Sequence, residues 1–356
     1  MAAGGFKTFV AGETLDQDEI NNYLMQGMLV FADSTARDAA ITSPVEGQFA
    51  FLKSDDKVYF YDSSAWVEFS AGGVAVEYVV IGGGGAGGYS INFAGGGGSS
   101  GGYRCNVVGE NSGGNSSAEP AMSLLAGAYS LIVGAGATGA TPRYAIAAHG
   151  SVSKLGSVLA LGGGPGATLD YVSGYSAGGA SASALAERTG GIGISFMSSA
   201  GGDAFNTTAS NSSAGGGGGA GAVGADAPTQ LVAGDGGAGL ASSITGSSVT
   251  RAGGGAGGSY YTGGTGGAGG GGAGGSANGV GTAGTANTGG GGGGSASRAA
   301  FYAGSNGGSG VVIFGVPTGT SVTFSGGVTQ TSATVGANTV YTVTATSTTS
   351  ETVTFA

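Results

Sequence analysis

Glycine makes up 85 of the 356 residues, charged residues make up 8%, and the formal net charge is −10. A single cysteine excludes an intrachain disulfide framework, and a single histidine leaves little for metal binding or acid–base chemistry. The acidic balance, with only 10 lysines and arginines, argues against nucleic acid as a partner.

The sequence contains no candidate for a membrane-spanning or secretory segment. Its apolar runs stay well below the ~18 residues that a membrane helix needs. Met1 to Lys7 lacks the charged region and apolar core of a signal peptide. We therefore expect no membrane insertion and no signal peptide.

Composition divides the chain into three regions. The glycines are concentrated in residues 73–310, whereas most of the net negative charge lies in the N-terminal residues. We predict a mainly β protein with a small α+β domain over residues 1–72, a glycine-rich body over 73–315 and a short β module over 316–356.

The first region begins with two predicted helices. Residues 14–20 combine capping side chains with acids in the first turn, which is typical of a helix start. A helix near 15–26 would place four apolar side chains on one face, Leu15, Ile20, Tyr23 and Leu24. Residues 34–41 predict a second, short helix.

Three aromatic runs follow, over residues 48–52, 57–61 and 65–69, and turn residues separate them. This pattern predicts a three-stranded meander. A domain of about 70 residues has only a marginal core, which an oligomer or a partner would supplement. We expect attachment or oligomerisation to involve the predicted helix face and Trp66.

The glycine-rich body is interrupted by short apolar stretches, such as 78–81, 129–133 and 311–314. It has no Gly-X-Y period, which excludes collagen. Scarce charge and apolar spacers favour order over a flexible linker. Ordering so many glycines costs on the order of 100 kcal/mol of conformational entropy. We therefore predict closely packed backbones that bond to each other, either as β-sheet or as polyglycine-II helices.

Alternating threonine and valine in the last region, over 321–324, 340–344 and 352–355, predict half-buried strands. Glycines between these stretches supply the turns. The C-terminal residues therefore form the predicted β module.

Motifs for catalysis are weak. Gly82, Gly84 and Gly87 fit the dinucleotide-binding pattern, but that site needs a helix after the glycines, and the glycine-rich residues that follow cannot hold one. Acids in the body are scattered singly, so no pair for glycoside cleavage stands out. We predict no catalytic residue, no metal site and no cofactor.

Aromatic pairs adjoin the glycine runs and are the candidate receptor-binding residues. Aromatic side chains on loops of a rigid scaffold suit sugar rings and apolar ligand faces. The pairs are Tyr89 with Phe93, Tyr171 with Tyr175, Tyr260 with Tyr261, and Phe301 with Tyr302. The alternative is that each pair covers the end of the glycine layers as a local core.

The body resembles the glycine-rich domain of bacteriophage tail-fibre and other virion proteins, including those of marine phages. The resemblance covers roughly residues 77–315 and rests on the stretches 77–88, 129–136, 244–255, 284–294 and 307–313. Family members often place basic and aromatic residues after the last strand, whereas Phe314-Gly315-Val316 stands here. Residues 11–13, 30–41 and 61–66 also resemble N-terminal modules of phage fibre proteins.

This resemblance implies a virion structural protein on the tail, often a homotrimer. We expect a tail-fibre or tail-tip protein without enzymatic activity, made in the host cytoplasm and attached to tail or baseplate proteins through residues 1–72. Loops at the end of the body would bind a bacterial surface glycan or an outer-membrane protein. The alternatives are a capsid-decorating or purely structural virion protein and, less favoured, a surface-glycan depolymerase.

Overall fold

A computed structural model describes residues 29–69, 73–139, 148–168, 189–195, 197–208, 211–298 and 300–356. The chain is mainly β, with 34% of residues in strands and 2% in helix, as the sequence predicts. It divides into two compact units, Met1–Gly73 and Val74–Ala356. The predicted helix near 15–26 lies outside the described residues.

The described part of the first unit, residues 29–69, is a four-stranded sheet with one short helix. The strands lie in the order β1 (Leu29–Phe31), β2 (Phe49–Leu52), β3 (Lys57–Tyr61) and β4 (Trp66–Glu68), with only the β1–β2 pair parallel. Helix α2 (Ser34–Ala40) begins after Asp33, whose carboxylate accepts the N–H of Ala36 at 2.8 Å. The predicted short helix and the meander are confirmed.

Helix α2 covers one side of this sheet. Its Arg37 is only 6% exposed, and the guanidinium lies 4.8 Å from the ring centroid of Trp66. Ala50 and Leu52 are buried on the same side. A cation over an indole face, with the aliphatic stem packed beside it, holds α2 on the sheet.

The second unit is organised around strands β5 (Val74–Ile81) and β17 (Val311–Pro317), which pair antiparallel from Ile81–Val311 to Glu77–Gly315. They lie inside a six-stranded sheet with β6 (Tyr103–Cys105), β9 (Met122–Leu124), β19 (Val328–Val335) and β20 (Asn338–Thr346). A five-stranded sheet has the order β12 (Val158–Ala160), β11 (Ser153–Leu155), β10 (Gly127–Ile132), β21 (Thr352–Phe355) and β18 (Val322–Phe324).

Both faces of β5 and β17 are buried. One face, with Val80 and Phe314, packs against Phe355 and its neighbours in the five-stranded sheet. The other face, with Val79 and Ile313, packs in a second cluster around Tyr103. This explains why the two strands read as continuous apolar runs rather than as an alternating pattern. The C-terminal strands belong to the same unit, because β20 pairs with β17 and β21 with β10.

Three two-stranded hairpins are the other strand pairs of the described residues. They are β7 (Asn111–Ser112) with β8 (Ser116–Ser117), β13 (Phe205–Thr208) with β14 (Asn211–Ser213), and β15 (Leu240–Ser242) with β16 (Val249–Arg251). Among the described residues, no helix combines the length and apolarity needed to cross a bilayer.

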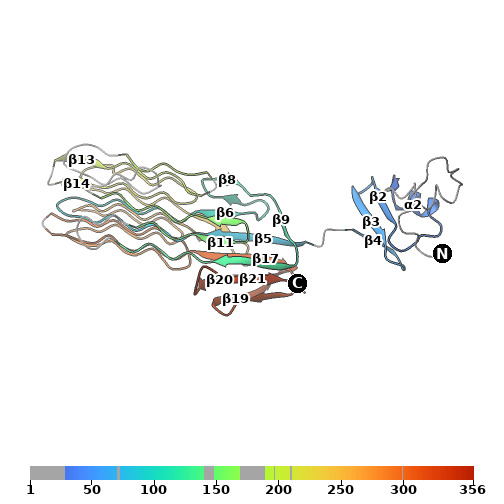
Figure 1. Cartoon of the computed structure of the whole chain (residues 1–356). Helices are drawn as coiled ribbons and strands as arrows, with labels where there is room; N and C mark the ends of the chain where they lie inside the picture. Colours follow the sequence, from blue (N-terminus) through green and yellow to red (C-terminus); the bar gives the residue numbers. More distant parts are fainter. Residues whose placement is uncertain are drawn as a thin grey trace, which may run out of the picture. The chain divides into compact units, whose positions relative to one another are not determined.

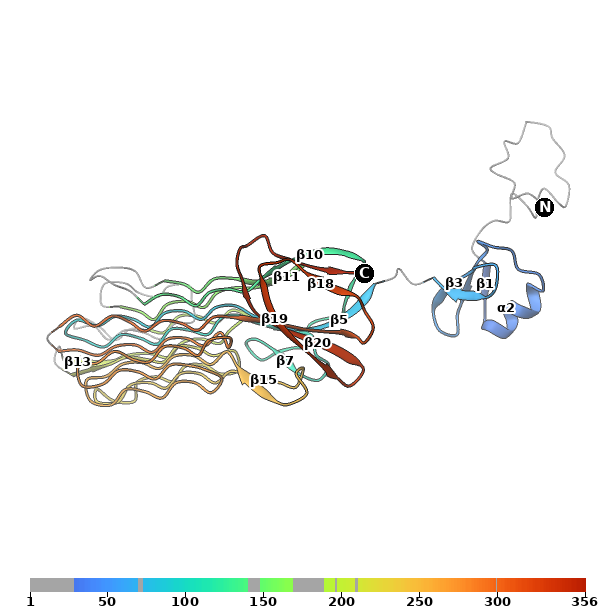
Figure 2. The same cartoon turned by 90° about the horizontal axis from the view of Figure 1, so that it is seen from below.

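Beyond the sheets, the chain runs back and forth in glycine-rich segments that lie side by side as undulating traces (Figures 1 and 2). Residues 82–88 continue directly from β5 without a helix, so the pyrophosphate site of a dinucleotide fold is not formed there. Their N–H groups donate to three neighbouring segments in turn. The donor–acceptor pairs are Gly82–Gly102, Gly83–Ser151, Gly84–Gly308, Gly85–Ser99, Ala86–Ala148, Gly87–Ser305 and Gly88–Gly96.

Residues 82–88 therefore donate to the same neighbouring segment at every third residue. A β ladder would repeat every second residue, whereas three residues per turn is the period of polyproline-II-type helices. Such a chain has no internal hydrogen bonds and directs its N–H groups to several neighbours. This arrangement supplies the backbone bonding between neighbouring segments that the sequence predicts for the body.

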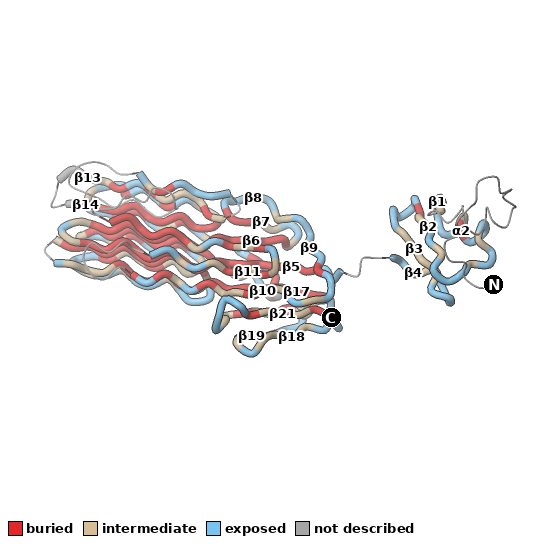
Figure 3. Tube along the Cα trace, in the orientation of Figure 1, coloured by how far each residue is buried: buried red, intermediate tan, exposed pale blue. Residues whose placement is uncertain are grey.

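The segments approach so closely that glycine is required. A Cβ on Gly85 would lie closer than 3.0 Å to the carbonyl oxygen of Gly164, and one on Gly97 would meet Gly255 in the same way. Both obstacles are backbone atoms of other segments, which cannot rotate away. Glycine in the body is therefore a packing requirement rather than a sign of flexibility. Figure 3 shows the resulting buried centre.

A partly buried ion pair ties the sheets together. The Arg104 guanidinium on β6 donates to both carboxylate oxygens of Glu119, which also accept the hydroxyls of Tyr78 and Ser112 at 3.0 Å each. Burial raises the pKa of the Glu119 carboxyl, but the bond and attraction to Arg104 and the two hydroxyl donors outweigh it. The net pKa lies below its ordinary value of 4.5.

Replacing Glu119 with glutamine should lower the free energy of unfolding of this unit by about 2 kcal/mol at neutral pH, because Arg104 would keep its partly buried charge without a carboxylate. The folded-state pKa of Glu119 is depressed, so its contribution is complete above 4.5 and is lost as the pH falls below that value. Chemical denaturation at neutral and acid pH should show a smaller acid loss for Glu119→Gln than for the unaltered protein. Equal losses would contradict this prediction.

Candidate functional site

The turns between glycine segments meet at the end of the second unit opposite the sheets, near β13 and β14 (Figures 1 and 2). We call this the turn end and define it by residues 89–94, 229–232, 259–262, 276–280, 296–298 and 300–302. Short bridges join these turns, namely Ser90–Tyr302, Ala94–Ala296, Gly279–Ala296 and Val232–Thr262, and Ser213 of β14 bridges Ser259.

Asparagine shapes two of these turns. Asn92 and Asn278 each have a φ of 63°, a left-handed conformation that asparagine adopts more readily than most residues. The Asn278 side-chain oxygen also accepts the backbone N–H of Arg298 at 2.9 Å, which joins two turns. The turn end is therefore held by backbone and side-chain bonds between neighbouring turns.

An aromatic pair with a fixed cation is the most distinctive feature of this end. The rings of Tyr260 and Tyr261 lie 5.4 Å apart at 89°. The Arg298 guanidinium carbon lies 3.6 Å from the ring centroid of Tyr260 and 4.9 Å from that of Tyr261. Tyr261 is 47% exposed. Tyrosine and arginine are the residue types enriched at energetically important positions of protein interfaces.

The other predicted aromatic residues are placed differently. Tyr89 is buried and packs against Phe301, with ring centroids 5.4 Å apart, in a small cluster with Ala86 and Ala137. Phe301 and Tyr302 are half-buried, as is Phe93. Tyr171 and Tyr175 lie outside the described residues. The structure thus brings Tyr89 together with Phe301, and Tyr260 together with Tyr261.

Aliphatic residues that the sequence reasoning missed add to the turn end. Leu231 is 41% exposed, Val232 37% and Val280 56%. The carbonyl of Leu231 accepts the N–H of Thr262 at 3.0 Å, which sets it beside the tyrosine turn. Arg298 was missed as well. The signal that could have found these residues is position, because each lies between two glycine runs, as the aromatic pairs do.

Carboxylates on the body bind backbone groups. Asp203 accepts the N–H of Gly190 at 2.8 Å, Asp226 that of Asp203 at 2.7 Å, and Asp235 that of Thr265 at 2.5 Å. Each carboxylate oxygen here takes the place of a backbone carbonyl acceptor. Among the described residues, no cluster of three or more histidine, cysteine or acidic side chains could hold a metal ion.

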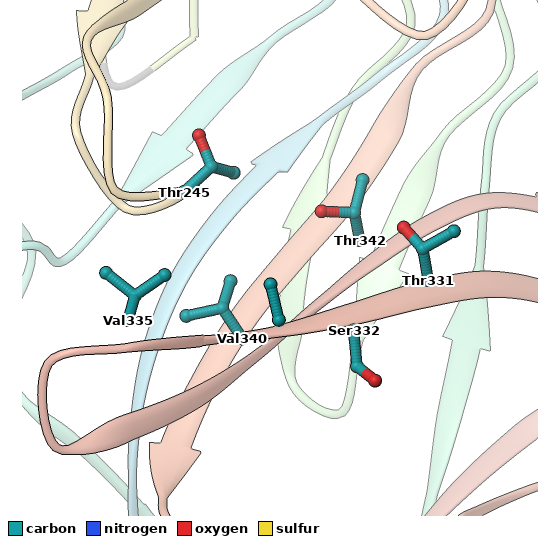
Figure 4. Close-up of a pocket in the computed structure, with 7 residues that line it drawn as sticks. Thr245, Thr331, Ser332, Val335, Val340 and Thr342 are labelled. Carbon is teal, nitrogen blue, oxygen red and sulfur yellow. The ribbon is translucent and has the colours of Figure 1, made fainter.

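A pocket of about 80 Å³ lies at the sheets, far in the fold from the turn end. Figure 4 shows Thr245, on the turn between β15 and β16, facing side chains of β19 and β20 such as Thr331 and Thr342. Ligand pockets usually measure about 300–1,000 Å³. This pocket is therefore too small for a substrate of ordinary size.

Comparison with known protein families agrees with this glycine-rich backbone architecture. A family model described as a glycine-rich domain matches residues 62–317. The chain belongs to this family. No curated protein matches the sequence. The glycine-rich domain includes β5, β17 and every turn of the turn end, and its match stops before β18.

Proposed function

We propose that this protein is a bacteriophage tail-fibre or tail-tip protein that binds a receptor on the host cell through the turn end, without catalysis. The observation that carries the proposal is the turn end itself. A rigid scaffold of bonded backbones presents exposed Tyr261 beside the guanidinium of Arg298, and exposed Leu231 and Val280 lie on turns that bond to these residues' turns. Rigid frames with variable turns are a common way to build binding surfaces.

The assignment to the virion is supported by the resemblance of residues 77–315 to the glycine-rich domain of phage fibre proteins. Under this proposal, residues 1–72 attach the protein to tail or baseplate proteins, and copies of the chain assemble as a homotrimer. The receptor is a bacterial surface glycan or an outer-membrane protein. The protein is made in the host cytoplasm and ends in the virion tail.

Purified protein should bind cells of the phage host saturably and should block adsorption of the phage to them. Light scattering should give a mass near three chains, and antibodies to the protein should label the tail in electron micrographs. Failure to bind host cells would contradict the receptor role and leave a structural role. Label on the capsid would favour the decoration protein instead.

A further inference from the structure

We propose that one side of the N-terminal sheet is the surface through which copies of this chain associate. Along each strand, alternate side chains point away from α2, and those of paired strands lie on the same side. They are Val30 of β1, Phe49 and Phe51 of β2, Val58 and Phe60 of β3, Val67 of β4, and Phe69 directly after it. We call this set the apolar sheet face.

Much of this face is open to solvent. Val30 is 55% exposed, Phe49 39%, Val67 38% and Phe69 53%. Figure 3 shows exposed and intermediate residues along β2, β3 and β4. Contiguous apolar patches of more than a few hundred Å² are uncommon on monomeric proteins and mark interaction sites.

The aromatic rings of the face are already packed together. Phe69 lies 5.4 Å from Phe49 and 6.2 Å from Phe60 between ring centroids, with both pairs edge-on. Such an arrangement loses little side-chain entropy when a second surface covers it. The face is thus preorganised for contact.

The charges of the sheet lie on its other side. Glu68 follows Val67 and points toward the α2 side, where Lys57 bonds its carboxylate at 2.7 Å. Trp66 also lies on that side, against Arg37. Self-association through the apolar sheet face would therefore bury no charge, and the oligomerisation role that the sequence suggests for Trp66 falls instead to the opposite side of its sheet.

The available area suits association with further copies of the chain. With about 200 Å² for a fully exposed phenylalanine, the face offers on the order of 400 Å² of apolar surface. Apolar area is roughly 65% of a homodimer interface. Each copy then buries on the order of 600 Å², so three faces turned toward a common axis bury on the order of 1,800 Å² in total, which is within the range of specific interfaces.

Composition also favours copies of this chain over a transient partner. Permanent homo-oligomer interfaces resemble a domain core cut in half, whereas transient ones mix apolar and polar residues. A unit this small, with a helix over one side of its sheet, gains core when copies turn the open side toward a common axis. The inference deepens the proposed homotrimer by naming its surface, and in that respect rests on the proposed function.

The test uses the full chain. Phe49→Asp/Phe69→Asp should raise the dissociation constant of the multimer at least 100-fold and give the mass of one chain by light scattering. Val45, 64% exposed in the loop before β2, provides the matched control, and Val45→Asp should keep the multimer. Trp66 is the single tryptophan, so unchanged emission shows that the unit remains folded.

A second variant gives a positive signal. Under mild oxidation, Phe69→Cys should join two chains by a disulfide, whereas Val45→Cys should not; the native Cys105 is buried in the other unit. A monomeric unaltered protein, a multimer insensitive to Phe49→Asp/Phe69→Asp, or a Phe69→Cys thiol protected within a monomer would each overturn the proposal. Tyr261→Ala should leave the mass unchanged, so failure of receptor binding and failure of self-association are separate results.

Discussion

A Gly97→Ala variant should lose about 3 kcal/mol of stability, at the upper end of the usual cost of overpacking, and should melt roughly 10 °C lower. The added methyl group would meet the carbonyl oxygen of Gly255 and the backbone nitrogen of Gly217, each closer than 3.0 Å. The N–H of Gly97 also donates to Gly215 at 3.1 Å. Relief of the clash would therefore separate three segments.

Gly326→Ala is the matched control. Gly326 lies in a turn between β18 and β19, and a Cβ there would meet nothing within 4 Å. This variant should melt within about 2 °C of the unaltered protein, or slightly higher, because alanine restricts the unfolded chain. Calorimetry would measure the melting temperatures of the Gly97→Ala and Gly326→Ala variants. Similar melting temperatures would mean that the glycine segments tolerate side chains and are not closely packed.

The second large effect concerns receptor binding. Tyr261→Ala and Arg298→Ala should each weaken binding to host cells at least 30-fold, which corresponds to about 2 kcal/mol. Tyr261 offers exposed aromatic surface, and Arg298 supplies the charge that lies 4.9 Å from its ring centroid. Because the two side chains touch, the double variant should lose less than the sum of the single losses.

Leu125→Ala provides the control for this experiment. Leu125 is 57% exposed but lies beside β10, away from the turn end. It should bind host cells as the unaltered protein does, measured by competition with phage adsorption. If all three variants bind equally well, the receptor site lies elsewhere on the molecule.

The strands were largely readable from local sequence. Apolar runs at 78–81 and 311–314 and the aromatic runs of the N-terminal unit correspond to β5, β17 and β2 to β4. Their side chains alone set the strand propensity and the burial pattern. The pairing of β5 with β17 was not readable, because backbone hydrogen bonds between distant segments carry no residue-specific signal.

At the turn end, too, the local sequence predicted the turns but not their neighbours in the fold. The sequence predicted that Tyr89 and Tyr261 lie on turns, because glycine runs flank both aromatic pairs. Only the packed neighbours decided that Tyr89 is buried against Phe301 while Tyr261 is exposed beside Arg298. Leu231 and Val280 share with the tyrosines the position between glycine runs, but only the fold shows that Leu231 bonds to the turn of Tyr260 and Tyr261.

The sequence by itself determined that the body is ordered backbone with little charge, and that the chain is mainly β. Glycine content and apolar spacers suffice for that, because they restrict which groups can pack and bond. The tertiary structure alone decided which segments are neighbours, with their three-residue repeat of hydrogen bonds. Within residues 29–69, it also decided that α2 packs on the side of the N-terminal sheet that holds Trp66, while Phe49 and Phe69 on the opposite side are partly exposed.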